Sequence, residues 1–211
     1  MKRRFLTVLL TAALIFTMCT PAAFASSKKV KMTTYNVVKS GNTVYCPATG
    51  DGIYKVTLNN GQVINVQWLV KTDFFMEPDS YITSMAKKGK YLYYIQWTEG
   101  TITYLYRVNT LTRKKEKVAL NAEKYAIKKN KLYAKICTMK DDGVKTRYKV
   151  MKLNGKAAKK TPVRIKMKTK QSNAEGYSVY YTQRGYYYYT YLRTPAGNFE
   201  IGKVYDEYAE W

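Results

Sequence analysis

The segment GKYLYYIQWTEGTITYLYRVNTL, residues Gly89–Leu111, contains the pattern that recurs through this chain. Apolar and aromatic residues alternate with polar ones up to a Glu-Gly turn, and a similar alternation follows the turn. A period of two residues is typical of strands with one buried face. A glycine at the turn can adopt the positive φ that a tight hairpin needs. The segment therefore predicts a β-hairpin.

Three further segments repeat this pattern. They read GNTVYCPATGDGIYKVTL (41–58), NKLYAKICTMKDDGVKTRYKVMKL (130–153) and GYYYYTYLRTPAGNFEIGKVY (185–205). Each has tyrosine in its first strand, turns at a glycine and returns through an aromatic-charged-aliphatic triplet, such as Tyr54-Lys55-Val56. With the shorter β-like pieces between the hairpins, each repeat reaches about four strands.

A repeat of about 40 to 50 residues with about four strands is the pattern of a β-propeller blade. We predict an all-β, β-propeller-like array of about four blades, built from antiparallel hairpin repeats at about 33–70, 79–120, 124–166 and 176–206. Little sequence follows Tyr205. Either the segment around 33–39 completes the last blade, or the array stays incompletely closed.

The tyrosines then have mainly an architectural role. A flat aromatic ring packs well on a pleated, half-buried surface. We expect Tyr93, Tyr106, Tyr133 and Tyr148 to be mostly buried residues of the repeats rather than ligand contacts.

The pattern KGKYLYYIQW…GTITYLYRVNT resembles the β-propeller-like repeats of secreted and surface proteins of Clostridia and related Firmicutes. Those repeats are classed as a domain of unknown function, DUF5050, or likened to the LDL-receptor-related β-propeller. The resemblance covers about residues 35–205. It implies extracellular binding, and it carries over no catalytic residue.

The N-terminus has the features of a secretory signal peptide over residues 1–25. Three basic residues precede an apolar run that is shorter than the ~20 residues needed to span a bilayer, and a small-x-small triplet ends at Ala25. Cleavage between Ala25 and Ser26 would leave residues 26–211 as a domain with no membrane span, either secreted into the medium or associated with the cell wall. An uncleaved anchor or a lipoprotein modified at Cys19 is less favoured.

The sequence lacks the residues of common catalytic centres. It contains no histidine, which removes the usual general base and the commonest zinc ligand. Cys46 and Cys137 lie in non-adjacent repeats, which favours two small core residues over a disulfide. Most acidic residues lie singly or at hairpin turns, as at Asp141 and Asp142. We therefore expect no enzyme, no cofactor and no metal site; a carboxylate-based glycan-acting enzyme is the least favoured class.

The charge of the chain is the main indication of function. The net charge is +23, and removal of residues 1–25, which hold three basic and no acidic residues, would leave +20. Basic residues gather at 113–117, 128–131 and 164–170, and Lys166 and Lys168 alternate with uncharged residues as on a strand with one basic face. Lysine greatly outnumbers arginine, which argues against sequence-specific nucleic-acid recognition.

We therefore predict a non-catalytic secreted or surface binding module for an anionic cell-wall polymer or acidic glycan. The alternative is a protein-interaction module that recognises another secreted protein. The candidate ligand contacts are Lys114, Lys115, Lys128, Lys129, Lys166, Lys168, Trp68 and Trp97, with Trp211 as a further exposed aromatic candidate.

Overall fold

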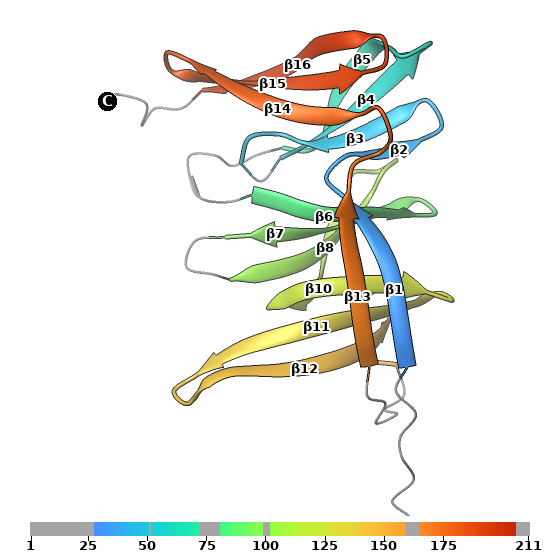
Figure 1. Cartoon of the computed structure of the whole chain (residues 1–211), viewed down its shortest axis with the longest axis vertical. Coiled ribbons are helices and arrows are strands. Elements are labelled where there is room, and N and C mark those ends of the chain that lie inside the picture. The colour runs from blue at the N-terminus through green and yellow to red at the C-terminus, as the bar shows by residue number, and fades with distance from the viewer. Residues whose placement is uncertain (1–27, 51, 72–80, 99–101, 159–164, 206–211) are drawn as a thin grey trace, which may run out of the picture.

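The computed structural model describes residues 28–50, 52–71, 81–98, 102–158 and 165–205 (Figure 1). These ranges contain sixteen strands and no helix, so the all-β prediction is confirmed. No helix capable of crossing a membrane is found in this part of the chain. The predicted signal peptide, its Ala25–Ser26 junction and Trp211 lie outside the described residues.

Fourteen of the strands form four antiparallel sheets in which neighbours in sequence are neighbours in space. The first sheet consists of β2 (Val38–Ser40), β3 (Thr43–Pro47), β4 (Ile53–Asn59) and β5 (Gln62–Val70). The second consists of β6 (Tyr81–Lys88), β7 (Tyr91–Trp97), β8 (Thr103–Asn109) and β9 (Lys115–Leu120). The third consists of β10 (Ala122–Lys128), β11 (Lys131–Lys140) and β12 (Gly143–Lys152). The fourth consists of β14 (Ser178–Arg184), β15 (Tyr187–Thr194) and β16 (Gly197–Tyr205).

The two remaining strands form a parallel pair, the β1–β13 ribbon. β1 (Lys28–Tyr35) and β13 (Ile165–Ser172) are in register along their whole lengths. One residue pair, Tyr35 with Met85, joins β1 to the edge of the second sheet. The third sheet therefore has three strands, because the chain leaves it for β13 instead of adding the expected fourth strand.

The four sheets are stacked in the order fourth, first, second, third (Figure 1). Each neighbouring pair shares an apolar cluster, as where Leu192 and Ile201 of the fourth sheet pack with Val56 of the first. Among the described residues no buried cluster joins the fourth sheet to the third. The stack is open at both ends, and the described sheets do not close into a four-bladed ring.

The fourth sheet packs on the first with its strands reversed end to end, so that its glycine turn lies at the opposite end from the glycine turn of the first sheet. Thr194, at the end of β15, donates a hydrogen bond of 2.7 Å from Oγ1 to the carbonyl of Gly61, in the turn after β4. The β15–β16 turn therefore meets the β4–β5 turn, whereas the corresponding β3–β4 turn lies at the other end of β4. The segment 33–39 does not complete the fourth sheet, because its residues belong to the ribbon, the first sheet and their connection.

The predicted burial of tyrosines is correct only in part. Tyr93 and Tyr133 are buried and Tyr106 is half-buried, but Tyr148 is 40% exposed, so the prediction for Tyr148 is wrong. Tyr133 and Tyr148 share a face of the third sheet, since Tyr133 pairs with Val150 and Tyr148 with Lys135. The β1–β13 ribbon covers Tyr133, whereas Tyr148 lies on the solvent-facing part of edge strand β12.

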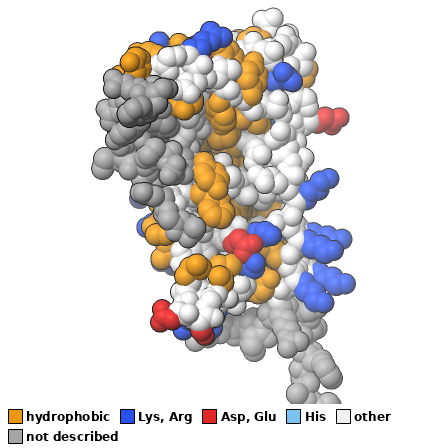
Figure 2. Space-filling view, turned by 60° about the vertical axis from the view of Figure 1, so that its left-hand side comes forward, with side chains coloured by type: hydrophobic (Ala, Val, Ile, Leu, Met, Phe, Trp, Pro, Cys, Tyr) orange, Lys and Arg blue, Asp and Glu red, His pale blue; other side chains and the backbone are white. Residues whose placement is uncertain are grey.

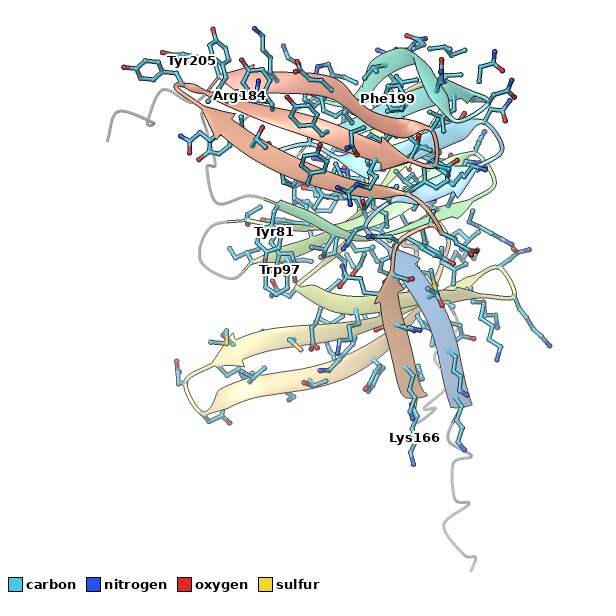
Figure 3. All side chains as sticks on the ribbon, turned by 45° about the horizontal axis from the view of Figure 1, so that its top comes forward. Tyr81, Trp97, Lys166, Arg184, Phe199 and Tyr205 are labelled. Atoms are coloured by element: carbon cyan, nitrogen blue, oxygen red, sulfur yellow. The ribbon has the colours of Figure 1, made fainter. Side chains whose placement is uncertain are left out.

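The tyrosine run at 186–191 supplies both faces of the fourth sheet. Leu192 and Thr190 are buried toward the first sheet. Tyr187, Tyr189 and Tyr191 alternate with them along β15 and therefore lie on the opposite, outer face. The alternate rings pack with basic side chains: Lys203 Nζ lies 4.7 Å from the centroid of Tyr187. Because the fourth sheet ends the stack, no described sheet covers this outer face (Figure 3).

Candidate functional site

The β1–β13 ribbon has one apolar and one basic face because lysine alternates with apolar residues in both strands. Val30 and Ile165 are buried with Ala126 and Tyr133 of the third sheet. Met32 and Met167 are half-buried against the same cluster. The intervening lysines consequently face away from the sheets, as predicted from the alternation around Lys166 and Lys168.

Parallel pairing brings the lysines of the two strands into rows. Lys29 is opposite Lys166, Lys31 is opposite Lys168, and Thr33 is opposite Lys170. All five lysines are exposed. From strand geometry, neighbours across the ribbon are about 4.8 Å apart at the backbone and neighbours along a strand about 6.6 Å. We call this set of five lysines the lysine face; basic side chains project along one edge of the molecule in Figure 2, and Lys166 is labelled in Figure 3.

The lysine face has no internal charge compensation. Within the described residues, none of its lysines forms an ion pair. Like charges directly opposite each other in a sheet destabilise it. An anion bound between the rows would remove this repulsion.

Two glutamates of the second and third sheets are paired with basic side chains outside the lysine face. Glu116 accepts hydrogen bonds from Arg107, and Glu123 accepts one from Lys135. Burial opposes the ionisation of Glu123, but hydrogen bonds from Cys137 and Lys135 and the charge of Lys135 outweigh it and lower the pKa of this carboxyl to about 2. These carboxylates stabilise the second and third sheets.

A groove continues from the end of the lysine face. This lysine groove has a volume of about 830 Å³ and is lined by Lys39, Lys87 and Lys170 together with the polar residues Ser172 and Asn173. Lys87 is oriented by a 2.8 Å hydrogen bond from its Nζ to the carbonyl of Gly89. One acidic residue, Glu175, is among the described residues of the wall. The groove extends the positive surface toward the first and second sheets.

The basic cluster at 128–131 lies beside the ribbon. The amide of Ile127 donates a 2.9 Å hydrogen bond to Met32 Sδ, which brings the end of β10 to the middle of β1. Lys128 and Lys129 follow at an exposed turn, where Lys129 and Asn130 both have positive φ. The structure therefore brings this cluster and Lys166 and Lys168 to one region.

The cluster at 113–117 lies away from the ribbon, at the opposite edge of the second sheet, and some of its side chains contact neighbouring strands. In the six-stranded arrangement β13-β1-β6-β7-β8-β9, β9 is the edge opposite β13. Lys115 donates a 3.0 Å hydrogen bond to Gln96 and lies 4.2 Å from the centroid of Tyr106. Lys114 is exposed at the turn before β9, away from the ribbon.

The two described tryptophans occupy different environments. Trp68 is half-buried in the cluster between the first and fourth sheets, with its ring centroid 4.1 Å from that of Tyr54. Trp97 is half-buried and stacks on Tyr81 at 5.8 Å with an interplanar angle of 3°. Trp68 therefore has a packing role in the core between two sheets. Trp97 stacks under the exposed ring of Tyr81.

The cysteines and acidic residues form no reactive arrangement in the described part of the chain. Cys46 and Cys137 are free thiols; burial raises the pKa of Cys46, and the Cys137 thiol donates to Glu123 at 3.0 Å. In the ranges that the structure describes, no group of three or more Cys, Asp or Glu residues could hold a metal ion.

Five basic residues of this surface were not among the candidate ligand contacts: Lys29, Lys31, Lys39, Lys87 and Lys170, of which Lys170 lies in the predicted basic segment 164–170. The sequence around Lys29 and Lys31, KKVKM, has the same alternation as RIKMK around Lys166, and this similarity could have identified β1. Lys39 and Lys87 have no such local signal. No family model matches the chain, and no curated protein matches it significantly, so the resemblance to secreted propeller-like repeats stays a prediction.

Proposed function

We propose that the protein is a non-catalytic binding module for an anionic surface polymer, which lies along the lysine face and the lysine groove. The observation that carries this proposal is the register of the ribbon: it places five exposed lysines side by side with no ion pair among the described residues. The secretory features of the N-terminus support a polymer outside the cell.

The lysine face suits a repeating anion better than one small ligand. A lysine ammonium is a strongly hydrated point charge, so each contact is weak and tolerant of geometry. Rows that repeat about every 6.6 Å along the strands can contact successive phosphates or carboxylates of one chain. We also infer that the stacked sheets are a relative of the propeller-like repeats, on the strength of their four glycine-turn hairpins.

The test compares two variants of equal charge. One replaces Lys29, Lys31, Lys166, Lys168 and Lys170 by Gln; the control replaces Lys71, Lys114, Lys140, Lys145 and Lys149, which are also exposed, by Gln. Retention on immobilised polyphosphate and on a carboxylated polysaccharide is measured between about 50 and 200 mM salt, the range over which contacts that release counterions weaken strongly.

We expect the wild-type protein and the control to bind with a steep salt dependence, and the ribbon variant to bind weakly with a flatter slope. Equal losses in the two variants would mean that net charge alone is responsible. Absence of binding to both polymers at low salt would refute the proposal.

A specific observation favours the protein-interaction alternative as a second candidate. The outer face of the fourth sheet combines Tyr187, Tyr189 and Tyr205 with Arg184 and Arg193. Tyrosine and arginine are enriched at protein interfaces and at their energetic centres. A complex through this face should persist at about 200 mM salt, where charge-driven polymer binding is greatly weakened.

A further inference from the structure

A second groove lies where the first, second and fourth sheets meet. Its volume is about 480 Å³, and its described lining includes Asn36, Thr49, Tyr81, Gln171, Tyr181 and Tyr188. No described residue of this lining is charged. In a chain of net charge +23, an uncharged groove with aromatic walls indicates a different ligand chemistry from that of the lysine face. We call it the aromatic groove.

Two exposed rings of the aromatic groove are held in place. Tyr181 is 42% exposed, yet its hydroxyl donates a 3.2 Å hydrogen bond to the carbonyl of Pro47, and burial of the hydroxyl raises the pKa of Tyr181. Tyr81 is 49% exposed and lies parallel to Trp97 (Figure 3). Rings already fixed in orientation lose little conformational entropy when a ligand packs on them.

The polar groups of the groove match hydroxyl groups, which both donate and accept hydrogen bonds. Gln171 Nε2 donates to Asn36 Oδ1, which leaves the second N–H of that amide and the Gln171 carbonyl for a ligand. Thr49 Oγ1 is buried and has no hydrogen-bond partner among the described residues. A buried hydroxyl without a partner carries a desolvation cost, which a ligand hydroxyl would offset.

The aromatic groove and the lysine groove are neighbours that share one wall residue. Asn173 lines both of them, at the end of β13. Lys170 belongs both to the lysine face and to the wall of the lysine groove. A ligand long enough to contact both sides of Asn173 would reach from the basic surface to the aromatic one.

We propose that the aromatic groove binds an uncharged sugar unit of the polymer, with its apolar C–H face on Tyr81 or Tyr181 and its hydroxyls on the amides and Thr49. Sugar rings present apolar C–H faces and hydroxyl edges, and mixed aromatic and amide walls complement both. The ligand class is thus an anionic polymer that carries sugar residues. This inference rests on the proposed function, because it assigns the second part of the same ligand.

The experiment titrates the full domain with neutral oligosaccharides of glucose, galactose and N-acetylglucosamine. Binding is measured from chemical-shift changes in NMR spectra of the protein at about 50 and 500 mM salt. Because the described lining holds no charged residue, we expect binding of at least one sugar with the same affinity at both salt concentrations. Tyr81→Ala and Gln171→Ala should each weaken it about tenfold. The matched control is Tyr205→Ala, which removes a ring of similar exposure (42%) from the outer face of the fourth sheet and should change it less than twofold.

The outcomes separate this inference from the proposed function. Salt-dependent polymer binding with no sugar binding at either salt concentration would overturn the inference alone. Sugar binding together with unchanged polymer binding in the five-lysine variant would overturn the proposed function alone. Binding of sugars that Tyr205→Ala weakens as much as Tyr81→Ala would place the sugar elsewhere and refute the inference.

Discussion

Replacing Gly202 by alanine tests how the fourth sheet packs on the first. A Cβ on Gly202 would lie 2.1 Å from Tyr54 Oη and 2.5 Å from its Cζ. Ordinary van der Waals contact begins at 3.4 Å, so the hydroxyl of Tyr54 would have to move by about 1.3 Å, the difference between 3.4 and 2.1 Å. Tyr54 is only 3% exposed, and its ring lies against Trp68, so little space is open to it.

Overpacking of this kind costs about 1–3 kcal/mol. We expect Gly202→Ala to lower the free energy of unfolding in urea by about 2 kcal/mol, near the middle of that range. Tyr54→Leu removes the atoms that clash, so the double variant should be more stable than the sum of the single effects predicts. The coupling energy between contacting residues should be about 1 kcal/mol or more.

Circular dichroism and urea titration of the four proteins of this cycle give the measurement. Strictly additive effects would mean that Gly202 and Tyr54 are not in contact and that the fourth sheet does not pack as described. Full stability of the Gly202→Ala variant would lead to the same conclusion.

Three further predictions concern burial and ionisation. Tyr93→Ala should cost about 3–5 kcal/mol in urea unfolding, whereas Tyr148→Ala, on an exposed face, should cost about 0.5 kcal/mol or less; similar losses would contradict the burial of Tyr93. The pKa of Glu123 is about 2 in the folded protein against 4.5 ordinarily, so the stability it contributes is present above pH 4.5 and lost as the pH falls toward 2. The urea midpoint of the Glu123→Gln variant should therefore change less with pH over that window than the midpoint of the wild-type protein. The same pH dependence in both proteins would argue against the ion pair with Lys135. Burial raises the pKa of Tyr125 well above 10, so stability should fall as the pH rises above 10, and a Tyr125→Phe variant should reduce the phenolate absorbance change that accompanies alkaline unfolding.

The sequence by itself was sufficient for the all-β class and for the hairpins, although it did not identify β1. Period-two alternation and glycine turns are local properties, so 89–111 and 185–205 could be recognised as hairpins without knowledge of the rest of the chain. The same alternation identified one basic face at 166–170. The basic clusters were visible as well, but their distances from one another were not.

Tertiary structure alone decided which strands meet. Lys28–Tyr35 and Ile165–Ser172 are far apart in sequence, and their parallel pairing follows from burying Val30 and Ile165 together on the third sheet. That pairing assembles the lysine face, and the ribbon covers Tyr133 but not Tyr148. Packing likewise separates Lys114 from the ribbon and reverses the fourth sheet. Strand formation depends on neighbours in sequence, whereas pairing between distant strands depends on the apolar area that the whole fold can bury, and no local pattern records it.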